Sequence, residues 1–156
     1  MASWRADPRL RGVWLSVTDL PDIHALNAGV VREFRANGGK LGGQLEEFTI
    51  LLLTTTGAQS GLPRLSPMSY FLIDDKMFII GSFAGVDYDP GWAHNLRANP
   101  RAHIEVGTTE YDVIARELPR EERDHVYSKM VEMAPIVGEY QARTSRVIPL
   151  FELQKV

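Results

Sequence analysis

Cysteine is absent from the 156 residues of this chain. Its absence excludes disulfide bonds, thiolate nucleophiles and thiolate metal ligands, and it fits a reducing compartment. Long apolar runs are missing too, because the densest of them, residues 48–53, is far shorter than the roughly 20 residues of a membrane-spanning helix. We therefore expect a cytoplasmic protein with no integral membrane segment, which leaves attachment to a membrane surface open.

A strong charge of either sign is also missing, since 17 basic and 20 acidic residues give a net charge of −3. Interspersed charges of this kind produce no summed field that would attract a polyanion, so no nucleic-acid partner is expected. The first residues hold no apolar run of signal-peptide length, because Arg5, Asp7 and Arg9 interrupt them. We expect residues 1–20 to form an N-terminal extension that can be flexible and residues 21–156 to form a single domain.

Common catalytic and metal-binding motifs are missing as well. The histidines His24, His94, His103 and His125 lie far apart and none has a partner at HExxH spacing, so we predict no metal site. A GxSxG elbow, a Walker loop and a GxGxxG fingerprint are all absent, which leaves hydrolase, nucleotidase and Rossmann dehydrogenase functions without support. The chemistry is then expected to come from a bound cofactor.

The patterns that are present indicate strands with a few helices. Apolar residues recur at helical spacing over residues 21–36, where Asp19 can cap the start and Gly38-Gly39 can end the helix. Strands are predicted at 48–56, 65–73, 77–83, 101–106, 109–118 and 147–153, and further helices at 90–99, with Asp89 as its cap, 119–133 and 137–142. Because parallel strands need long crossovers, this order predicts a small antiparallel barrel with helices packed around it.

Two stretches could bind an anion. In LLLTTTGAQSGLPR, Gly57, Ser60 and Gly61 let backbone N–H groups face one concavity, and Arg64 adds a permanently charged fork. The alternative for this stretch is a plain β-hairpin with an arginine in solvent. In IIGSFAGVDYDPGWAHNL, Ser82 follows a strand just before a helix N-terminus. Trp92 in this stretch is either an aromatic wall of a site or part of the core.

These two stretches, together with EFRANGGKLGG and MAPIVGEYQARTSRVIPLFEL, resemble the deazaflavin-dependent nitroreductase family of actinobacteria. In that family LLLTTTGRKSGxxR, a strand ending in serine, PxWxxNLxANP and YxxYQxxTxRxIP follow one another in this order. The resemblance runs from about residue 25 to the C-terminus. It implies an oxidoreductase with a mainly β (α+β) fold, an FMN-binding-like split β-barrel, which binds reduced coenzyme F420 and passes a hydride from its C5 carbon to an electron-poor substrate.

The resemblance also implies which residues meet the cofactor. Those placed at its phosphate tail are Gly57, Gln59, Ser60, Gly61 and Arg64. Those placed along its ring and linker are Pro67, Met68, Ser82, Phe83 and Ala84, with Trp92 and Asn95 completing the wall. A deazaflavin carries its own two-electron chemistry, so the protein supplies mainly orientation, electrostatics and exclusion of water.

The chain departs from the family pattern at several positions. Ala58-Gln59 replaces Arg-Lys, and Phe83 stands where some relatives have lysine, so we expect weaker or less salt-sensitive binding of a long-tailed cofactor. Ala134 and Val137 occupy positions where nitroimidazole-reducing relatives carry tyrosines. The resulting apolar pocket suggests a small hydrophobic acceptor such as a quinone, an enone or a coumarin-type lactone, with nitro compounds as a further class.

Tyr140 matches the last aromatic residue of the family's substrate region and is our candidate catalytic residue, as a hydrogen-bond donor to the reduced substrate. Two alternatives remain open at this stage. One is an FMN-dependent oxidoreductase on the same barrel, and the other is a non-catalytic carrier of deazaflavin, haem or a fatty acid. The sequence also leaves the oligomeric state open, a homodimer included.

Overall fold

A computed structural model describes residues 20–42 and 49–156 of the chain. The elements are α3 (Leu20–Ala36), β1 (Ile50–Thr56), β2 (Pro63–Ser69), β3 (Phe71–Ile73), β4 (Lys76–Ile80), the short 3₁₀ helix η2 (Phe83–Gly85), α4 (Gly91–Ala98), β5 (Arg101–Val106), β6 (Thr109–Glu117), α5 (Arg120–Met133), α6 (Ile136–Ala142) and β7 (Leu150–Lys155). The expected Asp19 cap and residues 1–19 of the expected extension lie outside the described residues, whereas Leu20 already belongs to α3.

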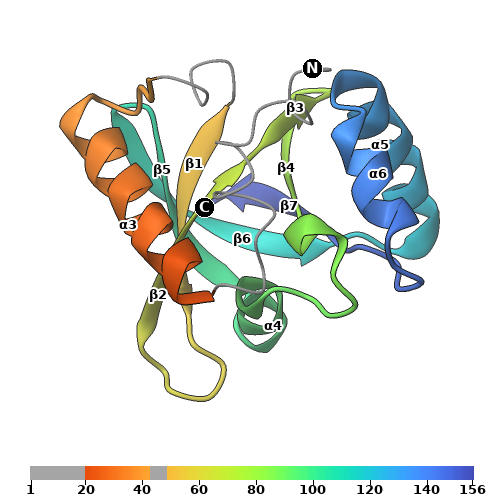
Figure 1. Cartoon of the computed structure of the whole chain (residues 1–156), viewed down its shortest axis with the longest axis horizontal. Coiled ribbons are helices and arrows are strands. Elements are labelled where there is room, and N and C mark those ends of the chain that lie inside the picture. Colours follow the sequence, from red (N-terminus) through yellow and green to blue (C-terminus); the bar gives the residue numbers. More distant parts are fainter. Residues whose placement is uncertain (1–19, 43–48) are drawn as a thin grey trace.

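The strands form one antiparallel sheet in the order β2-β1-β5-β6-β7-β4-β3. The two outermost strands, β2 and β3, are separated in the chain by Tyr70 alone. Opposite ends of the strand order are therefore joined end to end through Tyr70, and the sheet curls round on itself (Figure 1). The predicted antiparallel barrel with helices around it is confirmed.

The predicted strand at 65–73 is two strands rather than one. Residues up to Ser69 pair with β1, whereas Phe71 pairs with Phe78 of β4. At the change of partner, the Tyr70 N–H still donates to the Thr49 carbonyl at 3.0 Å. The bend at Tyr70 is thus the point where the chain crosses from one end of the strand order to the other.

Two turns use left-handed backbone, and the first of them confirms the predicted stop of the helix at Gly38-Gly39. Helix α3 ends at Ala36 and is followed by Gly38 and Gly39, with φ of 62° and 87°, and the Gly39 N–H donates to the Phe34 carbonyl at 2.7 Å. The β3–β4 hairpin turns through Asp74 and Asp75, whose φ values of 53° and 63° fit the turn type that matches the twist of paired strands.

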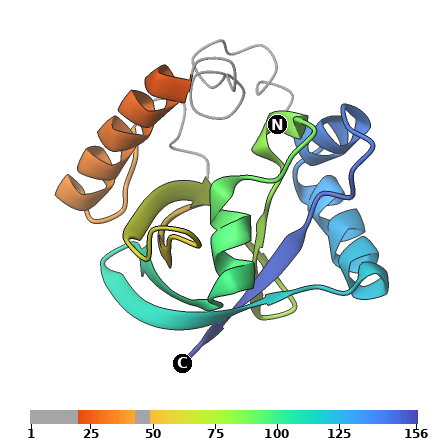
Figure 2. The ribbon, with the colours of Figure 1, turned by 90° about the horizontal axis from the view of Figure 1, so that it is seen from below.

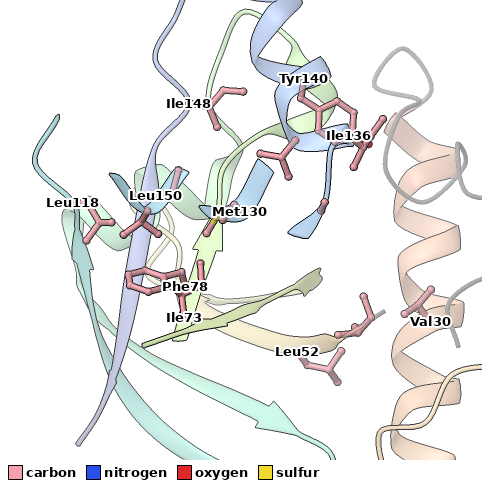
Figure 3. Close-up of a cluster of buried hydrophobic side chains, with 14 of the residues drawn as sticks. Val30, Leu52, Ile73, Phe78, Leu118, Met130, Ile136, Tyr140, Ile148 and Leu150 are labelled. Carbon is pink, nitrogen blue, oxygen red and sulfur yellow. The ribbon is translucent and has the colours of Figure 1, made fainter. Parts of the chain in front are cut away.

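Each face of the sheet carries its own hydrophobic core. The inner core joins the sheet to α4 and consists of Leu51, Leu53, Met68, Ile79, Ala93, Leu96, Ala102, Ile104, Val113, Ala115, Phe151 and Leu153. The outer core joins alternate residues of the same strands, such as Leu52 and Leu150, to α3, α5 and α6 (Figure 3). Seen from below, α4 crosses the end of the curled sheet, with α3 on one side and α5 and α6 on the other (Figure 2).

Candidate cofactor and substrate site

The loop between β1 and β2 is held by its own hydrogen bonds. The Gly57 N–H donates to the Leu62 carbonyl at 2.8 Å, and the Gly61 N–H donates to the Gly57 carbonyl at 2.9 Å. The Leu62 N–H donates to the Ser60 hydroxyl at 3.1 Å. A Cβ at Gly57 would lie 2.5 Å from Ser60 Oγ and would displace this hydroxyl, and Gly61 has a φ of 69°, a conformation that favours glycine.

Asn95 on α4 fastens the same loop to the helix. Its Oδ1 accepts a hydrogen bond from the Ala58 N–H at 2.9 Å, and its Nδ2 donates to Thr55 Oγ1 at 3.0 Å. The side chain therefore spans the end of β1 and the start of the loop. Asn95 therefore fixes the shape of the predicted anion site by holding the backbone of the loop against α4.

The β1–β2 loop leaves donors for an anion. Within the described residues, the N–H groups of Gln59 and Ser60 have no acceptor, and both residues are exposed. Arg64 is exposed next to them, with one guanidinium nitrogen 3.5 Å from Ser60 Oγ. Two neighbouring amides and one guanidinium fit a phosphate group. The donor set thus agrees with the tail end of a phosphate-bearing cofactor.

The loop between β4 and α4, residues 81–89, carries Ser82, Phe83 and Ala84. Ser82 precedes η2, and Phe83 has a φ of 42°, which is rare for a bulky residue. The Phe83 ring meets the exposed Tyr88 ring edge to face, with centroids 5.7 Å apart. Backbone strain of this kind at a candidate site is typical of a loop whose shape is imposed by its surroundings.

Helix α6 lies directly against this loop. A Cβ at Gly85 would come within 2.5 Å of the Tyr140 carbonyl oxygen and within 3.0 Å of the Arg143 Cβ. Gly85 also has a φ of 78°, so no other residue fits the contact without strain. The structure therefore brings the predicted residues Ser82 to Ala84 next to the helix of the predicted catalytic residue.

Tyr140 is buried in the outer core beside Ile136, with 6% of its surface exposed (Figure 3). Burial raises the pKa of its hydroxyl to about 12, although the Arg143 guanidinium, 5.5 Å from the ring centroid, acts in the opposite direction. Among the described residues the hydroxyl has no hydrogen-bond partner. A protonated, unpartnered hydroxyl can donate to a ligand.

The remaining predicted residues lie on β2 and α4, and two of them, Met68 and Trp92, pack in the inner core. Pro67 and Met68 are buried on β2, where they pair with Leu52 and Leu51. Trp92 is half-buried, and its ring packs edge to face on Phe151 with centroids 5.6 Å apart. This packing favours the interpretation of Trp92 as part of the core over its interpretation as an aromatic wall of the site.

One prediction about this region is wrong. Asp89 does not cap α4, because Pro90 is the N-cap residue and no side-chain hydrogen bond is made there. The Asp89 carboxylate instead accepts from the Arg97 guanidinium at 2.8 Å and from the Arg146 guanidinium at 2.7 Å. The Asp89 carboxylate thus binds two guanidinium groups instead of the N–H groups at the start of α4.

Arg146 is a residue that the sequence analysis did not single out. Its guanidinium is largely buried and donates to carbonyl oxygens of the β4–α4 loop as well as to Asp89. The signal was present in the sequence, because Arg146 is the arginine of the TxRxIP pattern at the end of the chain. Its role could not be found there, because its partners are some 60 residues away in the chain.

The described part of the chain contains no group of three His, Cys, Asp or Glu side chains that could hold a metal ion. A search of the same residues finds no helix with the length and apolar character needed to span a membrane.

Comparison with known proteins identifies the family. The family model described as F420H2-dependent quinone reductase matches residues 28–155. An F420H2-dependent quinone reductase of Mycobacterium tuberculosis is 34% identical over 128 residues, which cover 78% of this chain and 85% of the relative. The match is to an F420H2-dependent family, so it lends no support to the FMN alternative.

Solved structures agree with this match. A structure described as an F420H2-dependent reductase is 38% identical, with a TM-score of 0.61, and the comparison covers 68% of this chain and 94% of that one. A second structure, described as a domain-swapped dimer, is 34% identical with a TM-score of 0.64, covering 89% of this chain and all of that one (100%). The curled antiparallel sheet is thus a split β-barrel, and the chain belongs to the F420H2-dependent quinone reductase family of deazaflavin-dependent oxidoreductases.

Proposed function

We propose that this protein reduces a quinone with F420H2, and that enones, coumarin-type lactones and nitro compounds are further acceptors. The observation that carries the proposal is the contact between the β4–α4 loop and α6. There, Gly85 meets the Tyr140 carbonyl, and the buried Tyr140 hydroxyl has no partner among the described residues. Reduced F420, when bound, supplies the hydride from its C5 carbon.

The protein's own part begins with holding the cofactor. The N–H groups of Gln59 and Ser60 and the Arg64 guanidinium bind the phosphate, in a loop shaped by Gly57 and Gly61. Pro67, Met68, Ser82, Phe83 and Ala84 line the ring and linker, and Trp92 and Asn95 support the wall from α4. These residues come from the β1–β2 loop, β2, the β4–α4 loop and α4, so that cofactor binding joins four parts of the barrel.

The second task is to polarise the acceptor and stabilise the charge that develops on it. Tyr140 donates a hydrogen bond to the acceptor oxygen. Because burial raises its pKa to about 12, the hydroxyl stays protonated throughout the physiological range. The apolar neighbours of Tyr140 in the outer core exclude water, which strengthens a hydrogen bond to a developing oxyanion. A hydrophobic acceptor suits such surroundings.

The charge of the β1–β2 loop sets the affinity. Arg64 is the one cation between residues 57 and 64, and Ala58-Gln59 adds none. With few ionic contacts, the affinity for F420 changes little between low and high salt, and the length of an anionic tail has little influence on it.

The first experiment is a fluorescence titration of the purified protein with F420H2, followed by addition of menadione. Binding and menadione-dependent oxidation of F420H2 are expected. Binding without turnover of any acceptor would indicate a carrier. If the protein does not bind F420H2, the FMN-dependent alternative would be favoured. Light scattering of the same sample tests whether the chain forms a homodimer, as the domain-swapped relative suggests.

A further inference from the structure

The segment that joins α6 to β7, residues 144–149, runs along the β4–α4 loop, and we call it the strap. The Pro149 carbonyl accepts from the Gly81 N–H at 2.9 Å, and the Thr144 hydroxyl pairs with the Asp87 carboxylate at 2.9 Å. The two contacts lie near opposite ends of the loop and of the strap. Loop and strap are therefore aligned over most of their lengths.

Arg146 makes the central connection between them. Its Nη2 donates to the carbonyl oxygens of Gly81 and Ser82 at 3.2 and 2.9 Å. Its Nε donates to the Val86 carbonyl at 2.8 Å, and its Nη1 to the Asp89 carboxylate at 2.7 Å. One guanidinium thus forms hydrogen bonds with the loop on both sides of Phe83, the residue whose φ of 42° shows backbone strain.

Hydrogen bonds from α5 and α6 hold the strap in place. Gln141 donates to the Arg146 carbonyl at 2.7 Å and accepts from the Ile148 N–H at 3.0 Å. The buried Arg123 on α5 donates to Gln141 Oε1 at 2.7 Å and to the Ile148 carbonyl at 2.9 Å. The base from which Arg146 reaches the loop is therefore fixed to α5 and α6, the latter being the helix that carries Tyr140.

Only an arginine can make this connection. Its four acceptors are approached by three different nitrogens of one planar group, whereas a lysine offers a single nitrogen. The Arg146 side chain is 14% exposed and Asp89 17%, so the pair is shielded from competition by water. Such a fixed geometry suits the precise placement of backbone more than it suits general stabilisation, because buried ion pairs add little net stability.

We propose that Arg146 is a positioning residue: by gripping Gly81, Ser82 and Val86 it holds the strained β4–α4 loop at a fixed distance from Tyr140. The proposal rests on the proposed function, in which this loop lines the ring of the cofactor and Tyr140 meets the acceptor. Arg146 touches neither the cofactor nor the acceptor in this scheme. It acts through the loop, and its loss misplaces one reactant relative to the other.

The test compares Arg146→Lys with the wild type and with Arg116→Lys, a matched control. Arg116 on β6 binds the carboxylates of Glu152 and Glu122, outside the loop and the strap. In Arg146→Lys we expect kcat for menadione to fall about 10- to 100-fold, because small misplacements cost that much, while KM changes less than about threefold. Arg116→Lys is expected to keep the wild-type kcat.

Hydrogen exchange supplies a readout independent of activity. The amides of residues 81–89 should exchange at least about tenfold faster in Arg146→Lys than in the wild type, with no change in β5 and β6. Unchanged exchange in the loop, or a kcat within about twofold of wild type, would overturn the proposal. If the wild type does not reduce menadione but the loop still exchanges faster in Arg146→Lys, the proposed function is refuted. The proposal that Arg146 holds the loop would then still stand.

Two milder variants cover the case in which Arg146→Lys does not fold. Asp89→Asn keeps a hydrogen-bond acceptor without the charge, and Thr144→Val removes the contact with Asp87. Both should speed exchange in residues 81–89 and lower kcat by about two- to tenfold without raising KM to the same extent. If neither changes the loop or kcat, the strap does not position the loop.

Discussion

At the scale of single residues, the polar side chains of the site divide into those that face a ligand and those that hold the backbone in place. The Tyr140 hydroxyl has no partner among the described residues, so it is free to face a ligand. The amide group of Asn95 is occupied on both sides by Ala58 and Thr55. The two residues should therefore respond in different ways to substitution.

Tyr140→Phe is expected to lower activity without lowering stability. Loss of a positioned donor typically costs about 10²- to 10⁴-fold in rate, and we expect the lower end, about 10²-fold in kcat, since solvent can still supply a proton. Removing a buried hydroxyl that has no partner among the described residues leaves the free energy of unfolding unchanged or raises it by up to about 1 kcal/mol. Steady-state kinetics and urea denaturation measure the two quantities.

The control for this variant is Tyr127→Phe, because Tyr127 is a half-buried tyrosine of α5 whose hydroxyl pKa burial also raises. It should keep the wild-type kcat. Wild-type activity in Tyr140→Phe would remove Tyr140 from the reaction. Since the pKa of Tyr140 lies at about 12, its donor role also requires that kcat shows no loss from this group below about pH 10.

Asn95→Ala tests the attachment of the β1–β2 loop. The variant loses two hydrogen bonds, each of which contributes about 0.5 to 1.5 kcal/mol, so the free energy of unfolding should fall by about 1 to 3 kcal/mol. A loosened loop should also raise the Kd for F420 about tenfold, measured by fluorescence titration. His94→Ala changes an exposed neighbour on the same helix and should leave both values unaltered.

Residue-scale roles were the hardest to predict from sequence. Asn95 and Ala58 are 37 residues apart, and Arg146 reaches back 65 residues to Gly81, so no local pattern relates them. The hydrogen-bonding of Asp89 was predicted wrongly for the same reason. Local capping rules compare the carboxylate with the nearest helix end, whereas the folded chain supplies Arg97 and Arg146 as better partners.

At the scale of elements, the contact between η2 and α6 depends on a single glycine. Gly85→Ala would place a methyl group 2.5 Å from the Tyr140 carbonyl oxygen, at a φ of 78° that alanine disfavours. We expect the free energy of unfolding to fall by about 1 to 3 kcal/mol and kcat to fall with it, as the loop moves away from α6.

Gly91→Ala is the matched control for Gly85→Ala. Gly91 opens α4, and a Cβ there would meet no atom within 4 Å. Alanine at this helical position should be neutral or stabilising by up to about 1 kcal/mol. Equal stabilities for the two alanine variants in urea denaturation would show that α6 does not press on the loop.

The β5–β6 hairpin carries a pH-dependent element on its outer face. His103 lies 2.8 Å from Asp112 and 3.3 Å from Glu110, and the hydrogen bond to Asp112 is the main cause of its raised pKa. Arg101 binds the other oxygen of Asp112, and Arg35 of α3 binds Glu105 nearby. A raised pKa means that the folded state holds the proton more tightly than the unfolded state does.

The stabilisation from His103 is therefore complete below the unfolded pKa of about 6.5 and is lost as pH rises through the raised folded value. Because His103 and its partners are partly exposed, the loss should be small, about 0.5 kcal/mol or 1 to 2 °C in Tm. His103→Gln should flatten this part of the Tm profile, measured by thermal denaturation between about pH 5 and pH 9. An unchanged slope in His103→Gln would assign the pH dependence to other groups.

Elements themselves were predictable where their patterns were long and regular. Helix α3 and its glycine stop, β5, β6 and α5 lie close to the predicted ranges. The division of the predicted strand at Tyr70 was missed, because residues 68–73 contain no glycine or proline that would mark a break there. What divides it is the curl of the sheet, which is a property of all the strands together.

At the scale of the whole molecule, the strands β1, β4 and β7 belong to both cores at once. Leu51 and Leu53 of β1 enter the inner core and Leu52 the outer core, and β7 alternates in the same way between Phe151 and Leu150. The antiparallel barrel was predictable from strand spacing, but the placement of β5 beside β1 was not, since pairing order depends on these shared faces. We propose that residues 21–156 fold as one domain because neither core can form without the other.

The test is a pair of core substitutions on adjacent residues of β1. Leu52→Ala and Leu53→Ala each remove a fully buried side chain from a different core, and each should lower the free energy of unfolding by about 2 to 5 kcal/mol. Both variants should still unfold in one transition that coincides by circular dichroism and tryptophan fluorescence. Leu72→Ala, at a side chain 60% exposed, should stay within about 0.5 kcal/mol of wild type. A second transition in either core variant would mean that the inner core with α4 and the outer core with α5 and α6 unfold independently, and the single-domain proposal would then fail.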